Sequence, residues 1–443
     1  MLAAVASLDG CGTNGQGSCQ MLALLTTRCF GPLFATQFLG AFNDNLFRTA
    51  LVFIVAYDVA AADPKQAALL ASTAAGLFIA PFFLFSGMAG SAADARDKAG
   101  IAQLVKLSEI AFMALGWAAL AMGSLPLALA VVFLMGCHST LFGPIKYAIL
   151  PQHLKPQELI AGTGLVEGAT FVAILLGQVA GGLLATQAVG PITLAIAGLG
   201  WLASRFIPPA PPEPGRTLNW NPVSSSRAAL GHAFANRRLL IATLAISWFW
   251  ALGAVYTSQF VPLARNDMGA TQGVATLFLA AFSVGIAAGS VAVGRWLKGR
   301  ISTRLCGAAG LAMALAGIDL WFAIGAVGSA PKDVTAFFAT PAGWRVLADL
   351  TVLALAGGVF SVPLYAVLQT AGDAGTRASA IAANNIINSL FQVTAVLGAG
   401  AAVGAGLGVP LVLMLAGLTV LPLLPALLAL GRQDGTANIP NEN

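Results

Sequence analysis

Four polar side chains interrupt the apolar run 38–57, namely Asn43, Asp44, Asn45 and Arg48. Asp44 and Arg48 are four residues apart, so on a helix they share one face. This carboxylate and guanidinium either neutralise each other as a structural pair or offer their charges to a ligand. The flanking amides favour the second interpretation, because an ion pair alone does not need them. We therefore predict that these four residues line a ligand path.

A second group of polar residues follows Gly143-Pro144. Lys146 and Tyr147 stand near the end of one apolar segment, and Glu167 lies deep within the next. An ionisable residue inside an apolar segment is costly and is usually functional, although a lysine near a helix end also reaches the membrane surface. We expect Lys146 and Glu167 to pair and to line the path together with Tyr147.

The third group combines Arg377 with Asn384, Asn385 and Asn388. Asn384 and Asn388 share a helical face, and Asn385 lies next to it. Amides hydrogen-bond a phosphate or ester without the desolvation cost of a charge. They also join helices to one another, so both a substrate contact and a packing role stay open.

These residues belong to a chain built for lipid. Of its 443 residues, 58% are hydrophobic and only 9% are charged, whereas soluble domains carry roughly 25% charged residues. Apolar runs of about 20 residues recur, each long enough to cross a bilayer as a helix. This composition excludes a soluble enzyme and predicts a multi-pass membrane protein.

The apolar pattern predicts twelve membrane-spanning helices in two groups of six. The predicted organisation is a poorly ordered N-terminal segment (1–28), a first six-helix bundle (29–207), a linker (208–237), a second six-helix bundle (238–431) and a tail (432–443). The predicted spans are 32–58, 66–90, 99–122, 125–149, 158–186, 189–207, 238–264, 270–295, 303–327, 345–370, 376–403 and 409–431.

Charge placement orients these spans. With both termini cytoplasmic, most of the 22 lysines and arginines fall on the inner side, and the outer side holds Lys65, Arg265, Lys332 and Arg345. Such an excess of inner positive charge is typical of membrane proteins. The sequence thus predicts a membrane protein with both ends inside the cell.

The two groups of six spans are related to each other. The segment LGAF (39–42) matches LGAV (252–255), and FGPIKYAILPQ (142–152) matches FSVPLYAVLQT (360–370) at nearly the same offset. This alignment places Tyr147 opposite Tyr365. A duplicated six-helix unit with a central linker is typical of the major facilitator architecture, an all-α fold with its substrate path between the halves.

The loop GMAGSAADARDKAG (87–100) resembles the acidic and basic loop of that superfamily. Asp94 takes the acidic position and Arg96 follows it. An acid at a helix end can bind a basic residue or a helix N-terminus in one conformation and release it in another. We predict conformational gating by Asp94, Arg96 and Arg377, although a solvated charged turn is the alternative. Two glycine pairs, Gly177/Gly181 and Gly285/Gly289, allow close approach of helices. In the superfamily, spans 5 and 8 pack across the two halves, so these pairs serve either movement between the halves or ordinary tight packing.

Three segments resemble one branch of this superfamily, the bacterial lysophospholipid transporters, some of which are fused to an acyltransferase. The segments are TQFLGAFNDNLFRTALV (36–52), LFGPIKYAILPQHLKPQELIAGTGLVEGATFVAILLGQVAGG (141–182) and PLYAVLQTAGDAGTRASAIAANNIINSLF (363–391). The resemblance covers roughly residues 30 to 430.

This resemblance implies transport of lysophospholipids, such as lysophosphatidylethanolamine, across the inner membrane to the cytoplasmic leaflet for reacylation. Asp44 matches the acidic residue of the family's first-span motif, and a zwitterionic head group would use both Asp44 and Arg48. The chain holds no acyltransferase signature, so the implied partner enzyme is a separate protein.

Two other functions stay open, a proton-coupled exporter of drugs or small amphiphiles and a module that recruits an acyltransferase. The residues indicate no catalytic, metal-binding or cofactor-binding constellation and no nucleic-acid partner, and we expect a monomer surrounded by membrane lipids. We expect the five scattered cysteines to be reduced or incidental and to form no disulfide framework. Lys106 and Glu109, three residues apart, predict a structural ion pair outside the site.

Overall fold

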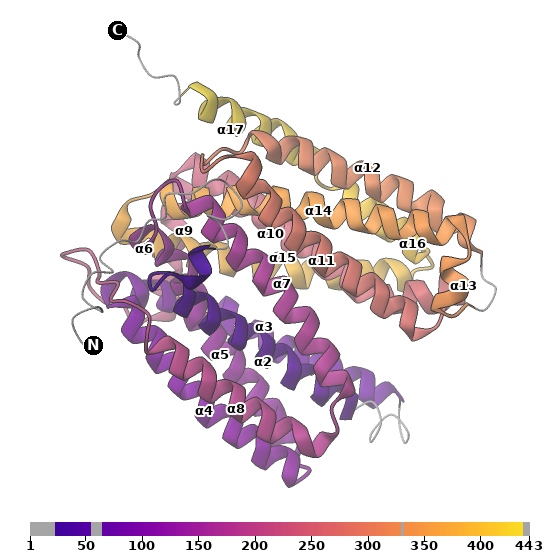
Figure 1. The fold of residues 1–443 in the computed structure, drawn as a ribbon, viewed down its shortest axis with the longest axis horizontal. Helices are drawn as coiled ribbons and strands as arrows, with labels where there is room; N and C mark the ends of the chain where they lie inside the picture. The colour runs from indigo at the N-terminus through magenta and orange to yellow at the C-terminus, as the bar shows by residue number, and fades with distance from the viewer. Residues whose placement is uncertain (1–22, 55–63, 329–331, 437–443) are drawn as a thin grey trace.

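The computed structural model describes residues 23–54, 64–328 and 332–436. The described chain forms two bundles of long helices (Figure 1). The first bundle contains α2 (Gly31–Ile54), α3 (Pro64–Ala95), α4 (Lys98–Ala121), α5 (Leu125–Ala148), α7 (Leu159–Leu183) and α8 (Thr186–Ser204). The second contains α10 (Arg237–Pro262), α11 (Gln272–Trp296), α12 (Arg304–Val327), α14 (Pro341–Thr370), α15 (Arg377–Gly404) and α16 (Val409–Leu418), which continues through η5 (Leu421–Leu423) into α17 (Leu424–Thr436).

Eleven described helical stretches are long and apolar enough to cross a membrane. The twelfth long helix, α2, has the length at 24 residues, but Asn43, Asp44, Asn45 and Arg48 reduce its mean hydropathy. This helix therefore depends on neighbouring helices to cover its polar face. The predicted membrane fold of two six-helix bundles is confirmed.

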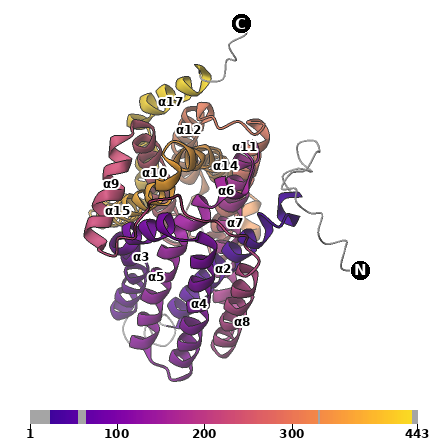
Figure 2. The same ribbon diagram turned by 90° about the vertical axis from the view of Figure 1, so that its left-hand side faces the viewer.

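Short helices gather at one end of the molecule. There α6 (Leu150–His153) and α9 (Pro222–Ala235) lie beside the ends of α5 and α15, and Figure 2 shows α9 alongside α15. We call this end, where the segment between the bundles runs, the linker end. The opposite end carries η3 (Leu263–Asp267) and α13 (Val334–Phe338). The turns η1 (Leu24–Thr26) and η4 (Ala374–Thr376) complete the described helical segments.

Three local features differ from the sequence predictions. The linker is partly helical, because Asn221 caps α9 through Val223 N and Ser224 N and small residues pack its inner face. Span 12 is interrupted at η5, where Pro422 has no backbone N–H to donate. Cys29 is disulfide-bonded, so the prediction of reduced cysteines is wrong there, whereas Cys137 and Cys306 are free.

The structure describes part of the predicted N-terminal segment and part of the predicted C-terminal tail. Residues 1–22 of the segment predicted to be poorly ordered and residues 437–443 of the predicted tail lie outside the described part of the chain. In the described remainder of the first segment, Leu24 is buried within the core of the bundles. At the other end, α17 extends beyond residue 431, and Asp434 accepts hydrogen bonds from Thr303 N and Oγ1 at 2.8 Å.

The bundles meet chiefly through α3 with α15 and α7 with α11. Gly164 and Gly168 of α7 allow close approach to Ser290 and Ala287 of α11. The predicted glycine pairs serve a different purpose: Gly177 and Gly181 pack against α2, and Gly285 and Gly289 pack against α14. Each pair therefore closes packing within one bundle, as the alternative of ordinary tight packing predicts, and a packing role between the halves is wrong for both pairs.

Candidate functional site

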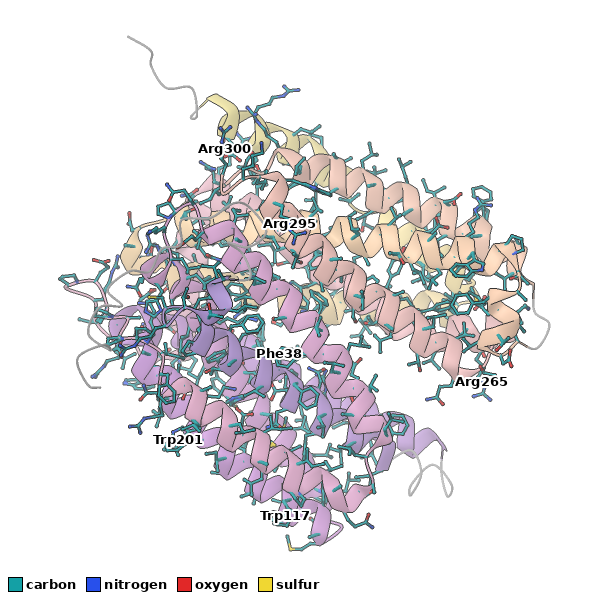
Figure 3. All side chains as sticks on the ribbon, in the orientation of Figure 1. Phe38, Trp117, Trp201, Arg265, Arg295 and Arg300 are labelled. Carbon is teal, nitrogen blue, oxygen red and sulfur yellow. The ribbon has the colours of Figure 1, made fainter. Side chains whose placement is uncertain are left out.

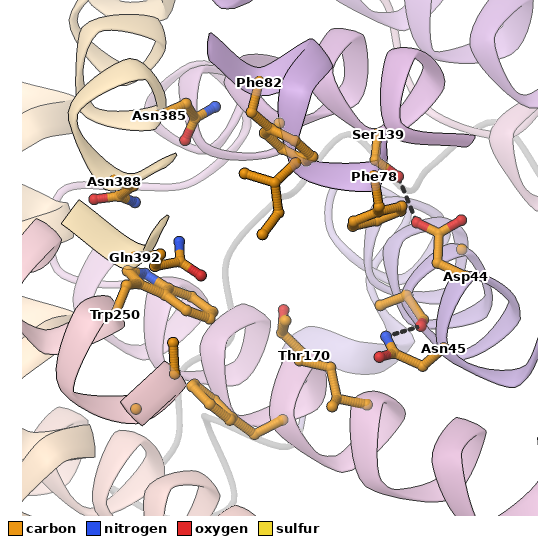
Figure 4. A pocket seen from close by; sticks show the side chains of 18 of the residues that line it. Asp44, Asn45, Phe78, Phe82, Ser139, Thr170, Trp250, Asn385, Asn388 and Gln392 are labelled. Atoms are coloured by element: carbon orange, nitrogen blue, oxygen red, sulfur yellow. Dashed lines mark hydrogen bonds between the residues drawn. The ribbon is translucent and has the colours of Figure 1, made fainter. Parts of the chain in front are cut away.

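A cavity of about 390 Å³ lies between the bundles. It is within the range of roughly 300–1,000 Å³ that small-molecule sites occupy. Helices of both bundles line it, including α2, α3, α5 and α7 of the first and α10, α11, α14 and α15 of the second. Figure 4 shows labelled side chains from both bundles around this space. The cavity is therefore placed where the duplicated architecture predicts a substrate path.

The polar face of α2 forms one wall of the cavity through Asp44, Asn45 and Arg48. Ser139 Oγ donates a hydrogen bond to Asp44 Oδ2, while Asp44 Oδ1 has no hydrogen-bond partner among the described residues. Arg48 Nη2 donates to Asn45 Oδ1 at 2.8 Å, and the guanidinium carbon lies 4.6 Å from the ring centre of Phe78.

The charges of Asp44 and Arg48 are thus not joined in a salt bridge with each other within the described chain. Each side chain is held by a neutral neighbour instead, and Asp44 is 7% exposed. A purely structural ion pair would bring the carboxylate and guanidinium together. The observed arrangement favours the interpretation in which both charges face a ligand.

Asn43 lies on the other side of α2 and does not line the cavity. It is fully buried, and its Nδ2 donates to Glu109 Oε1 at 2.8 Å. The prediction that Asn43 lines the ligand path is therefore wrong. Successive side chains on an α-helix point about 100° apart. A helix that directs Asp44 and Arg48 toward the cavity therefore directs Asn43 toward α4.

Behind this wall lies a buried charged cluster on α4 and α5. Lys106 Nζ lies 2.7 Å from Glu109 Oε2, so the predicted ion pair is present. His138 Nε2 also approaches Glu109 Oε2, at 3.1 Å. Lys106 and His138 line the cavity, so their omission from the predicted site was an error. The polar run His138-Ser139-Thr140 within an apolar segment was the signal that would have found His138.

Lys146 and Tyr147 line the cavity toward the linker end. The Lys146 ammonium lies 4.8 Å from the centre of the Tyr147 ring, and that ring stacks on Tyr365 of α14. Trp250 Nε1 donates a hydrogen bond of 2.7 Å to the Tyr365 hydroxyl. Aromatic side chains from both bundles therefore meet next to a positive charge.

Glu167 does not form the predicted ion pair with Lys146. Its side chain is fully buried outside the cavity lining, and neither carboxylate oxygen has a hydrogen-bond partner among the described residues. The two charges still interact electrostatically. The position of Glu167 on α7 is deep, as predicted, but the helix turns this side chain toward the packed interior.

The asparagines of α15 divide differently from the sequence prediction. Asn385 and Asn388 line the cavity with Gln392, which sequence reasoning missed, whereas Asn384 is fully buried outside the lining. The spacing 385, 388 and 392 follows one helical face. Ser247 Oγ donates to Asn388 Oδ1 at 2.6 Å, so this amide is already oriented.

The remaining cavity wall is mostly apolar and aromatic. Phe171 of α7 stacks on Trp250 of α10 with ring centroids 5.4 Å apart, across the boundary between the bundles. Further apolar side chains in the lining are Phe78, Ile79, Phe82, Ile174, Phe249, Leu279, Phe282 and Ile286. A ligand with a polar head and an apolar body would match both parts of this wall.

Asp94 joins the two bundles at the linker end. Its Oδ1 accepts from Ala378 N at 3.0 Å, and its Oδ2 accepts from Ser379 N at 2.9 Å and Ser379 Oγ at 2.6 Å. Asp94 from α3 thereby caps the N-terminus of α15, where backbone N–H groups lack partners and attract negative charge. Arg377 is the first residue of α15, and the Arg96 side chain is exposed.

Comparisons with known proteins agree with this architecture. The family model described as Major Facilitator Superfamily matches residues 19–396. The lysophospholipid transporter LplT of Citrobacter koseri is 30% identical over 80% of this chain and 83% of its own, and that of Enterobacter sp. (strain 638) is 29% identical over the same shares.

Solved structures show the same fold at low sequence identity. The human organic anion transporter MFSD10 superposes with a TM-score of 0.73 and 15% identity, covering 91% of this chain and 98% of its own. The transporter FucP gives a TM-score of 0.66 and 16% identity over the same shares.

Proposed function

The chain belongs to the major facilitator superfamily and, within it, to the lysophospholipid transporter family, and from this membership and the cavity we propose that it moves lysophospholipids across a membrane. The observation that carries the proposal is the pairing of two separate charges, Asp44 and Arg48, with an apolar aromatic chamber in one cavity. A lysophospholipid such as lysophosphatidylethanolamine has the matching chemistry, a zwitterionic head group and a single acyl chain.

In this proposal Asp44 binds the ammonium of the head group through its free Oδ1. Arg48 binds the phosphate, because a guanidinium presents paired donors that fit phosphate oxygens. Lys146 adds a second positive charge, and Tyr147, Asn45, Asn385 and Asn388 donate or accept hydrogen bonds around the glycerol and ester groups. The amide of Asn45 supports this geometry because it holds the guanidinium of Arg48.

The acyl chain occupies the aromatic part of the cavity. Phe171 and Trp250 come from different bundles, so the bound chain bridges the two halves. Exposure of this acyl chain to water would cost about 25 cal/mol per Å² of apolar surface. The apolar wall avoids that cost by replacing the surrounding lipid hydrocarbon, and the charged wall selects the head group.

Transport requires the two bundles to rock around this site. Asp94 holds the linker end closed by capping α15, and we propose that transport breaks this cap. Arg377 begins the capped helix, so release of Asp94 frees the helix N-terminus next to this residue. Arg96, exposed beside Asp94, is available to the carboxylate after release.

We place the linker end in the cytoplasm. Figure 3 shows Arg295 and Arg300 toward that end and Arg265 at the opposite end. Together with the excess of lysine and arginine there, this arrangement supports an inner-membrane orientation with both termini inside. A monomer that delivers lysophospholipid to a separate acyltransferase completes the proposal.

Uptake of labelled lysophosphatidylethanolamine tests the function. Spheroplasts that lack their own transporter would express the wild type, Asp44→Ala or the control Asp319→Asn, whose carboxylate bonds Arg345 away from the cavity. We expect the wild type and control to transport and Asp44→Ala to lose at least about tenfold, because a hydrogen bond to a charged group contributes roughly 1.5–3 kcal/mol.

Purified protein in liposomes then separates transport from recruitment of another enzyme. Activity of the pure protein would exclude a pure recruitment module. Absence of lysophospholipid uptake by a well-inserted wild type would overturn the proposal and favour an exporter of small amphiphiles.

A further inference from the structure

A chain of polar contacts runs from the cavity wall into the first bundle. Ser139 Oγ donates to Asp44 Oδ2, and Ser139 Oγ lies 3.3 Å from His138 Nδ1. His138 Nε2 lies 3.1 Å from Glu109 Oε2, which in turn lies 2.7 Å from Lys106 Nζ. Figure 4 shows the first of these contacts at the edge of the cavity. The chain thus connects the proposed head-group carboxylate to a buried imidazole.

The inner end of this chain indicates where one proton of His138 lies. Glu109 accepts hydrogen bonds from Lys106 Nζ and Asn43 Nδ2, as an ionised carboxylate does. Glu109 Oε2 lies 3.1 Å from His138 Nε2 without hydrogen-bond geometry, and the negative charge of the carboxylate favours a hydrogen on the nitrogen that faces it. The proton that remains variable is the one at Nδ1, on the side that faces Ser139.

Two proton arrangements satisfy the same heavy-atom positions. In the first, Asp44 is a carboxylate that accepts from Ser139, and His138 is an imidazolium whose Nδ1–H donates to Ser139 Oγ. In the second, Asp44 is a neutral carboxyl that donates to Ser139, and Ser139 donates to the bare Nδ1 of a neutral His138. In going from the second arrangement to the first, the O–H bond of Asp44 breaks and Ser139 takes that proton. The serine passes its own proton to His138, where an N–H bond forms at Nδ1. The total charge does not change.

We propose that Ser139 relays a proton between Asp44 and His138, so that Asp44 is ionised when a head group with an ammonium occupies the cavity and neutral when the cavity is empty. This inference rests on the proposed function. The ammonium of a bound head group stabilises the carboxylate. Without it, an ionised Asp44 that is 7% exposed carries a high desolvation cost.

The surrounding charges permit this exchange. Lys106 and Glu109 on α4 neutralise each other at the inner end of the relay. Arg48 on α2 interacts electrostatically with Asp44 but donates to Asn45, and Lys146 on α5 lies against Tyr147. The other helices near α5 bring uncharged groups to this part of the cavity lining, namely Phe78 and Phe82 from α3 and Asn385 and Asn388 from α15. In this part of the described chain, His138 is the base that the serine connects to Asp44.

The relay gives His138 and Ser139 a positioning role rather than direct contact with the lipid. The relay sets the charge of Asp44 according to whether a head group is bound, while the bundles move. The empty transporter then returns without an unpaired carboxylate in a low-dielectric cavity. A lysophospholipid without an ammonium would leave Asp44 neutral, so the relay also responds to head-group chemistry.

Ligand-induced infrared difference spectroscopy tests the relay in the full-length protein in lipid nanodiscs. Addition of lysophosphatidylethanolamine to the wild type should remove a protonated-carboxyl C=O band. The Asp44→Asn variant should lack this change, because it has no carboxyl there. Ser139→Ala should also lack it, whereas Ser139→Thr keeps a hydroxyl and should retain it. Lysophosphatidylglycerol, which has no ammonium, should leave the band in place.

Binding is measured in the same samples, and thermal unfolding checks that each variant is folded. Binding by the wild type without loss of the band would overturn the relay and leave the transport proposal intact. An equal band change in Ser139→Ala would also overturn it, because the hydroxyl would then be unnecessary. Absence of binding by the wild type would overturn the proposed function and the relay together.

Discussion

Tyr147 of α5 and Tyr365 of α14 stack on each other, with ring centroids 4.4 Å apart and an angle of 13° between the rings. These residues occupy equivalent positions in the two repeats FGPIKYAILPQ and FSVPLYAVLQT. Equivalent residues of two related halves meet where the symmetry axis between them passes. The stack therefore marks the axis at the linker end of the cavity, and opening of that end must separate the rings.

Loss of this stack should shift the molecule toward a conformation that is open at the linker end. Replacement of Tyr147 by alanine removes an aromatic pair worth about 0.5–1.5 kcal/mol, which corresponds to roughly a 2- to 10-fold change in the conformational equilibrium. Spin labels at Lys155→Cys and Arg300→Cys, both at exposed positions, would report the distance between the halves. Tyr147→Phe keeps the ring and should behave as wild type; an equal shift in this control would contradict the argument.

Loss of the Asp94 cap should also shift the molecule toward a conformation that is open at the linker end. Asp94→Ala leaves Ala378 N and Ser379 N at the start of α15 without their acceptor. Loss of an N-cap side chain costs about 0.5–2 kcal/mol. We expect faster labelling of Ala382→Cys, which is fully buried beside Gly90, by a membrane-impermeant maleimide. Arg227→Ala on the exposed face of α9 is the matched control, and unchanged labelling in Asp94→Ala would show that the cap does not hold this end.

Disruption of the buried Lys106–Glu109 pair should destabilise the protein. Both side chains are 1% exposed, so Glu109→Gln leaves a buried ammonium without its countercharge. Removal of one member of a buried pair typically costs 3–5 kcal/mol, whereas replacement of both by apolar residues is often tolerated. Thermal unfolding in detergent should therefore rank Glu109→Gln below the double variant Lys106→Met/Glu109→Leu. The opposite order would indicate that Lys106 is solvated from the cavity.

The asparagines of α15 should separate into two functional classes. Asn385→Ala removes an amide from the cavity wall and should raise the lysophospholipid concentration needed for half-maximal uptake several-fold, since a hydrogen bond contributes about 0.5–1.5 kcal/mol. Asn384→Ala, outside the wall, should affect unfolding temperature more than apparent affinity. A kinetic effect of Asn384→Ala as large as that of Asn385→Ala would return Asn384 to the substrate site.

The sequence alone determined the membrane fold, because its signals are additive along the chain. Hydropathy, the repeats and the motif resemblances predicted two six-helix bundles and a lysophospholipid transporter. The local spacing of Asp44 and Arg48 also placed both on one helical face, and both side chains line the cavity. The inferences about the spans and the shared helical face need only the period of a helix and the thickness of a bilayer, whereas the transporter inference rests on the motif resemblances.

Only the tertiary structure decided which neighbours each polar residue meets. Adjacent residues on a helix point about 100° apart, so Asn43 turned to Glu109 while Asp44 turned to the cavity. Glu167 was predicted to be deep, but the packing of α7 directed it away from an ion pair with Lys146. His138 gained its role from Glu109 on one side and Ser139 on the other. Such contacts depend on the rotation and packing of separate helices, which the local pattern of one helix does not specify.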